Sequence, residues 1–149
     1  MRDHPDHHDA ELLLRLYELR RDAKLREARE WMATEFRAES LEEYYKKYPL
    51  GSPENTRIRM VASYWDMAAS MVIHELIKEE FFFENTAEFW GIWSRLKHLA
   101  PGVRERRKNP YLWKNLEILA DRYEKWMEKR APGHLESIRE QVIKATPKG

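Results

Sequence analysis

Apolar residues recur three and four positions apart along most of this chain, which is the spacing of one face of an α-helix. No alternating or β-branched run competes with that pattern. Proline and glycine gather between the periodic segments, as expected of connections between helices. The sequence therefore predicts an all-α fold, with helices near residues 9–37, 41–48, 53–82, 86–99, 110–130 and 134–145. Residues that can cap these helices are Asp9, Ser40, Ser52, Asn85 and Asn109.

The segment 53–82 is expected to be the central helix, because apolar side chains occupy most of its circumference. Trp65 lies mid-way along it and is predicted to be among the most buried residues. A single polar stripe runs along this helix, with members three or four residues apart: Arg59, Ser63, Asp66, Ser70 and His74. These side chains must face solvent, a cavity or a partner, or form hydrogen bonds with one another.

The expected architecture is a compact bundle of four main helices plus one or two short helices. A chain of 149 residues can bury a full core as one domain, which we place at residues 9–145. We expect residues 1–8 to be a flexible tail rich in His and Asp, and 146–149 to be a C-terminal tail.

Composition narrows the class of protein. Apolar residues make up 42% of the chain and charged residues 36%, a mixture that excludes a disordered or membrane-spanning chain. The N-terminus is charged and has no apolar run, and cysteine is absent, so we expect a cytoplasmic protein without a secretion signal. The 27 basic and 26 acidic residues balance, so no global field draws the protein to nucleic acid or membranes. No cofactor-binding motif is present, so we expect no cofactor.

The first predicted helix has two apolar faces. Leu12, Leu16 and Leu19 define one face, and the face that begins at Ala28 lies roughly 140° away on an ideal helix. Either the helix bends between Arg20 and Glu27, or the leucines pack on a second copy of the chain. The second alternative makes the leading functional hypothesis a non-enzymatic interaction or scaffold protein that forms a homodimer.

A basic and aromatic stretch at residues 104–114 supports a different hypothesis. Its residues are Arg104, Arg106, Arg107, Lys108, Tyr111 and Trp113. Cations interleaved with rings are typical of surfaces that bind phosphates and stack bases. The alternative function is therefore a nucleic-acid or phosphate-binding module, although Glu105 interrupts the run and the balanced charge favours a solvated loop between helices.

An enzyme or metal site on helix 53–82 is the third hypothesis. Asp66 and His74 share the polar stripe, but eight residues separate them by roughly 12 Å of helix rise, too far for a catalytic dyad. Glu75 and Glu79 lie four apart on the apolar side, yet no histidine follows a glutamate by three residues, as di-metal bundles require. We therefore expect these glutamates to pair with Arg or Lys and to bind no metal.

A cluster near the N-terminus also contains metal-binding side chains. Its members are Asp3, His4, Asp6, His7, His8 and Asp9. A flexible segment loses chain entropy when it forms a metal site, so we expect a solvated tail and a helix cap.

The stretch from Asn55 to Glu80, with Arg57 and Trp65-Asp66, is followed by Phe89-Trp90 and a late amphipathic helix. In these features the chain resembles short all-helical bacterial proteins of uncharacterised function. The resemblance implies a helical fold and a prokaryotic origin. It contains no functional motif that could be transferred to this chain.

Overall fold

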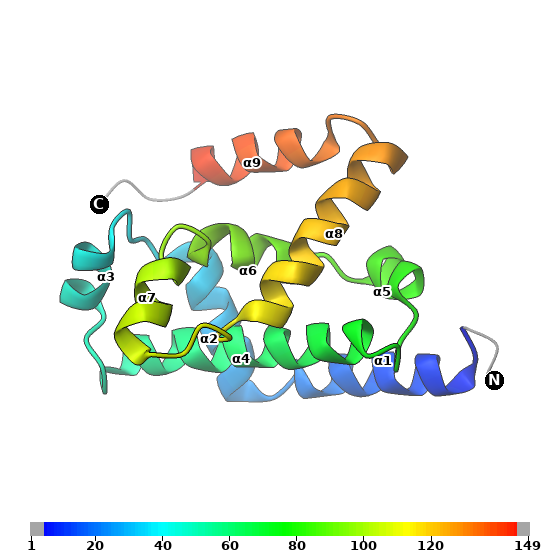
Figure 1. Cartoon of the computed structure of the whole chain (residues 1–149), viewed down its shortest axis with the longest axis horizontal. Coiled ribbons are helices and arrows are strands. Elements are labelled where there is room, and N and C mark those ends of the chain that lie inside the picture. Colours follow the sequence, from blue (N-terminus) through cyan, green and yellow to red (C-terminus); the bar gives the residue numbers. More distant parts are fainter. Residues whose placement is uncertain (1–4, 146–149) are drawn as a thin grey trace.

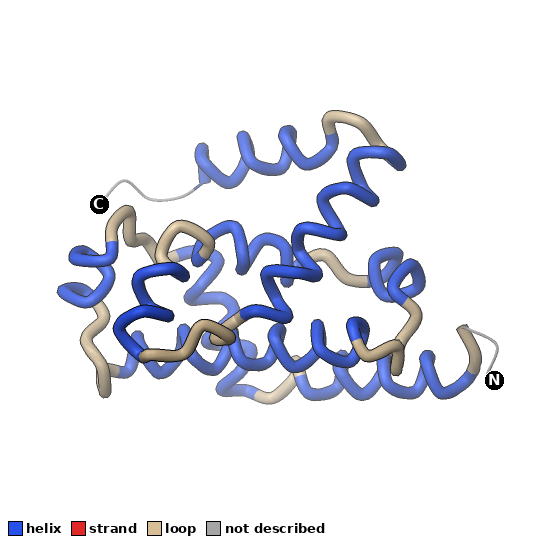
Figure 2. The backbone as a smooth tube through the Cα atoms, viewed as in Figure 1, coloured by secondary structure: helices blue, strands red, loops and turns tan. Residues whose placement is uncertain are grey.

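The computed structural model describes residues 5–145, and within that range all regular secondary structure is helical, which confirms the predicted all-α class (Figure 2). Residues 1–4 of the predicted N-terminal tail and the whole of the predicted C-terminal tail, 146–149, lie outside the described residues. The helices are α1 (His7–Leu19), α2 (Ala23–Thr34), α3 (Leu41–Lys47), α4 (Pro53–Ile73), α5 (Glu79–Asn85), α6 (Glu88–Leu96), α7 (Ala100–Arg107), α8 (Lys114–Arg130) and α9 (His134–Ala145).

The central position predicted for the long middle helix is confirmed. Figure 1 shows α4 running along the molecule beside α1, with α8 crossing it obliquely and α9 folding back over α6. The most extensive contacts of α4 are with α8 and α2. Trp65 is 1% exposed, as predicted, and Leu116 and Leu119 of α8 are fully buried. None of the helices in residues 5–145 combines the length and the apolar content needed to cross a bilayer.

The first predicted helix is two helices, so its single span over residues 9–37 was wrong. The chain turns after Leu19, and the Asp22 side chain caps α2 by accepting hydrogen bonds from the backbone of Lys24 and Leu25, each at 3.1 Å. This turn lies within the bend predicted between Arg20 and Glu27. At the other end, α1 begins at His7 and is capped by Asp6, two residues ahead of the predicted start.

The turn also corrects the predicted stripe of exposed leucines. Leu16 is 4% exposed and Leu12 packs partly buried against the core, because the bend lets both helices pack within one chain. Leu19 is 50% exposed, and the large apolar side chain most exposed on α1 is Leu14, at 62%.

The central helix is shorter than predicted. It ends in a Schellman motif in which Glu75 takes a left-handed backbone (φ 62°), the Glu75 N–H bonds to the Val72 carbonyl, and the Leu76 N–H bonds to the Met71 carbonyl. Glycine is the usual residue at that position, and its absence hid the helix end from sequence inspection.

A helix, α7, occupies the region where a solvated loop was predicted. Pro101 lies in its first turn, where a missing N–H costs nothing, so this proline starts a helix instead of separating two. Helix α8 begins at Lys114, later than predicted, and the Asn109 side chain closes a turn by accepting from the Tyr111 N–H at 3.0 Å. The predicted cap at Asn85 was also wrong, because α6 begins after Ala87 and Asn85 ends α5.

A half-buried ionic cluster ties the helices together around Glu88, in the first turn of α6. Arg29 of α2 donates two hydrogen bonds of 2.7 Å to the Glu88 carboxylate, and the indole N–H of Trp65 donates a third at 2.9 Å. Arg20 lies 3.8 Å from the same carboxylate. The hydrogen bonds that Arg29 donates to Glu88 raise the pKa of Arg29, so its guanidinium keeps its charge at neutral pH.

Candidate functional site

Asp66, a predicted catalytic candidate, has a structural partner. Its Oδ1 accepts a hydrogen bond of 3.0 Å from the backbone N–H of Leu116, in the first turn of α8. Trp113, which precedes this helix, contributes no side-chain cap. Asp66 therefore caps α8 from another helix and holds the start of α8 against α4.

His74, Glu75 and Glu79 do not assemble around Asp66. His74 is the exposed C-terminal cap of α4, eight residues along the chain from Asp66. Glu75 is exposed in the Schellman turn, and Glu79 opens α5 and forms an ion pair with Arg122 at 3.2 Å. The expectation that the two glutamates share one apolar helix face was wrong, because α4 ends before both of them.

The N-terminal cluster is partly ordered. Potential ligand atoms of Asp6, His7 and His8 lie within 4.8 Å of one another. The Asp6 carboxylate caps α1 and accepts from the His8 backbone at 2.9 Å, whereas the buried Asp9 accepts from the Lys78 N–H at 2.7 Å. These carboxylates therefore anchor the start of α1. The predicted members Asp3 and His4 lie outside the described residues.

Arg104 was predicted to belong to an exposed basic loop, and that prediction was wrong. Its side chain is 13% exposed, forms an ion pair with Glu117 at 3.0 Å and donates to the Leu112 carbonyl at 2.8 Å. Burial alone would raise the pKa of Glu117, but the hydrogen bond from Lys114 and the charge of Arg104 hold it below its usual value. Arg104 therefore joins α7 to α8.

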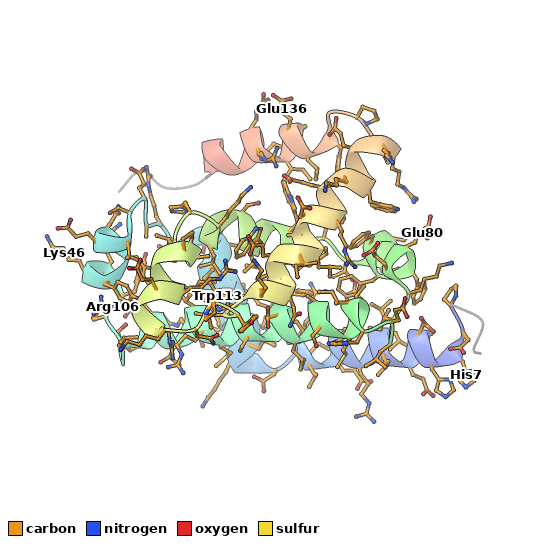
Figure 3. The ribbon with its side chains drawn as sticks, viewed as in Figure 1. His7, Lys46, Glu80, Arg106, Trp113 and Glu136 are labelled. Atoms are coloured by element: carbon orange, nitrogen blue, oxygen red, sulfur yellow. The ribbon has the colours of Figure 1, made fainter. Side chains whose placement is uncertain are left out.

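The remaining basic residues point in different directions. The guanidinium of Arg106 lies 4.0 Å from the ring centroid of Tyr45 in α3, and Figure 3 shows it at the α3 side of α7. Lys108 is the exposed left-handed residue that ends α7, and Tyr111 is 78% exposed. Arg107 faces a cleft between α4 and the start of α8.

This cleft, which we call the Arg59–Arg107 cleft, has a volume of about 440 Å³. Its walls come from α4, from the end of α7 and from the segment leading into α8. Its lining residues are Thr56, Arg59, Met60, Ser63, Arg107, Leu112 and Trp113. It therefore joins two members of the predicted polar stripe to two members of the predicted basic and aromatic stretch.

The two arginines give the cleft a positive charge. Among the described side chains, neither Arg59 nor Arg107 has an acidic partner or a hydrogen bond. Both also act on Tyr44 of α3: burial raises the pKa of Tyr44 to about 12 against the opposing effect of the two cations. The cleft is therefore lined by two arginines, neither of which pairs with a carboxylate among the described side chains.

Trp113 contributes a strained backbone to the same cleft. Its φ is 60°, a left-handed conformation that a bulky side chain rarely adopts, and its side chain is 6% exposed. Such residues cost on the order of 1–3 kcal/mol and cluster where ligands are held. Figure 3 places Trp113 where the segment between α7 and α8 passes over α4.

Sequence inspection found the parts of this cleft but not their union. Nothing in the sequence marked Thr56 as a site residue except that it lies one helical turn before Arg59 and Met60. Arg59 was assigned only to the polar stripe. The link is the hydrogen bond from the Leu116 N–H to the Asp66 carboxylate, which spans 50 residues of sequence and leaves no local pattern.

The comparisons place most of the chain in one family. The family described as Domain of unknown function (DUF4760) matches residues 5–126, from the start of α1 to near the end of α8. No curated protein and no solved structure gives a significant match. Helix α9 lies beyond the matched residues, whereas the Arg59–Arg107 cleft and the Glu88 cluster lie within them. Because the match covers well over half of its length, the chain belongs to the DUF4760 family.

Proposed function

We propose that this domain is a non-enzymatic binding module for molecules that carry a phosphate group, and that the phosphate binds in the Arg59–Arg107 cleft. The observation that carries the proposal is that two arginines without an acidic partner among the described side chains line one cleft together with the strained Trp113. Asp66 supports the site indirectly, because it fixes the start of α8 on α4.

The chemistry of the lining suits a phosphate ester. Each guanidinium can donate two parallel hydrogen bonds to phosphate oxygens, and two cations balance the charge of a phosphate monoester. The apolar part of the ligand would contact Met60, Leu112 and the indole of Trp113. The volume of about 440 Å³ falls in the range of small-ligand sites, so a single phosphate ester fits better than a duplex surface.

Isothermal titration calorimetry with adenosine monophosphate tests this proposal. Replacing both Arg59 and Arg107 with alanine should weaken binding by about tenfold or more, ~1.4 kcal/mol, without changing the unfolding midpoint. Arg106→Ala is the matched control, because Arg106 is an exposed arginine of the same helix that contacts Tyr45 instead of the cleft.

The titration has clear outcomes. Binding of inorganic phosphate alone would show that the anion is recognised, and tighter binding of a short single-stranded oligonucleotide would identify nucleic acid as the source of the phosphate. No heat at millimolar ligand and low salt, or equal binding by the double variant, would remove the proposal.

Self-association remains a second candidate because three large apolar side chains of α1, Leu14, Tyr17 and Leu19, are 38–62% exposed. Light scattering at micromolar concentration should give twice the chain mass of 18.1 kDa if this face forms a dimer. Leu14→Glu with Leu19→Glu should then yield a folded monomer. A native mass of one chain throughout that concentration range would exclude this candidate.

A further inference from the structure

A second cavity lies on another side of the molecule, between α2, α6 and α8, and α9 covers it in part. Its volume is about 530 Å³, and residues of all four helices line it. The apolar lining includes Ala33, Trp90, Ile92, Tyr123 and Ile138. We call it the Arg95 cavity, and it shares no lining residue with the Arg59–Arg107 cleft.

Arg95 is the unneutralised cation of this cavity. Two other lining arginines are paired: Arg29 with Glu88 at 2.7 Å, and Arg139 with Glu124. Arg95 is half-buried, and its guanidinium donates to the Ala33 carbonyl at 2.9 Å, with no acidic partner among the described side chains. Burial lowers the pKa of Arg95, and no carboxylate among the described side chains opposes that effect.

Gly91 leaves space in the cavity wall. It lies inside α6, where glycine destabilises a helix relative to alanine. A Cβ atom added to Gly91 would meet nothing within 4 Å, so packing within the chain does not require the glycine. A side chain at this position would instead project into space that a ligand could use.

Helix α9 supplies one wall of the cavity. Leu135 is 2% exposed and anchors the helix to the core, and the Arg139 guanidinium lies 5.1 Å from the ring centroid of Trp90 in α6. Ile138, which lies between Leu135 and Arg139 in the sequence, lines the cavity. The cavity is therefore an open and largely apolar pocket. Its one lining carboxylate, Glu88, is paired with Arg29, and its unneutralised positive charge comes from Arg95.

We propose that the Arg95 cavity binds a small amphiphilic carboxylate, with the carboxylate on the Arg95 guanidinium and the apolar body against Trp90, Ile92 and Tyr123. A carboxylate supplies the negative charge that Arg95 lacks and matches the fork of guanidinium N–H donors. An apolar body of modest length removes the apolar lining from water, and the volume lies in the range of small-molecule sites. This site is independent of the proposed phosphate cleft.

Decanoate is the probe, used with the full chain below the concentration at which it forms micelles. We expect decanoate to raise the melting temperature and to quench tryptophan fluorescence saturably. Decanol, which has the same chain without the charge, and decylamine, which carries the opposite charge, should bind at least tenfold more weakly. Arg95→Met should reduce decanoate affinity to the level of decanol, because it keeps an apolar stem and removes the charge.

Two further variants distinguish binding in the Arg95 cavity from a non-specific effect of decanoate on the protein. Gly91→Leu should fill the cavity and abolish decanoate binding while the melting temperature of the free protein stays equal or rises. Arg15→Met is the matched control, since Arg15 is an exposed arginine of α1 outside the cavity. Equal binding of decanoate and decanol, or full binding by a folded Gly91→Leu protein, would overturn the proposal. Neither result would bear on phosphate binding in the other cleft.

Discussion

Removing the Glu88 carboxylate should be among the most damaging single changes to this fold. Glu88→Ala leaves the Arg29 guanidinium, whose side chain is 17% exposed, without its two hydrogen bonds, and leaves the buried Trp65 indole N–H without an acceptor. Breaking a fully buried ion pair costs about 3–5 kcal/mol. Because the Glu88 side chain is 31% exposed, water can hydrate part of the freed charge, and we expect a loss of about 2–4 kcal/mol.

Urea unfolding followed by circular dichroism at neutral pH measures this loss. The midpoint should fall while the denaturant slope stays unchanged. Glu84→Ala is the control, because Glu84 is exposed on α5, and its effect should stay within about 0.5 kcal/mol.

A double-mutant cycle tests the cause of the loss. Replacing both Arg29 and Glu88 with methionine should recover part of the stability, since the Arg29 charge is removed together with its partner, whereas Arg20 and the Trp65 indole N–H still lose theirs. A cost for Glu88→Ala no larger than that of Glu84→Ala, or independent effects of the two methionine substitutions, would refute the reasoning.

Three further predictions concern local features. Glu75→Gly should stabilise the protein by about 0.5–1 kcal/mol, because it relieves a left-handed backbone; a lower urea midpoint would contradict this. Asp66→Ala should cost about 1 kcal/mol through loss of the α8 cap, and Asp66→Asn less; equal stability of Asp66→Ala and wild type would argue against the capping role. Burial raises the pKa values of Tyr44 and Tyr64 to about 12, above their ordinary value of 10.0. Their contribution to stability is therefore complete below pH 10 and is lost as pH rises toward 12, and urea midpoints measured across that range should fall less when both are phenylalanine.

The core could be predicted from sequence because it depends on local periodicity. Residues three and four apart on one helix share a face whatever the rest of the chain does, so the burial of Trp65, Leu116 and Leu119 follows from spacing alone. The same spacing continues across a turn when the residues on both sides are apolar. For that reason the long helices were predicted to continue past Leu19 and Ile73, where the structure ends them.

The helix ends were missed because their residues depart from the usual preferences. Glu75 and Lys108 take left-handed positions where glycine is expected, and Pro101 starts a helix where it was taken to separate two. Tertiary packing outweighs these local costs, and a single sequence does not display tertiary packing. The cleft was missed for the same reason, because the hydrogen bond from the Leu116 N–H to Asp66 joins residues far apart in the sequence.

A two-dimensional NMR titration with adenosine monophosphate tests the proposed phosphate site most directly. The probe is the indole N–H signal of Trp113, assigned by its disappearance in Trp113→Phe, together with the backbone amides of Arg59 and Arg107. We expect these signals to shift saturably, while the Trp90 indole signal in the Arg95 cavity stays in place. Unchanged Trp113, Arg59 and Arg107 signals at millimolar ligand, or shifts confined to other parts of the chain, would contradict the proposal.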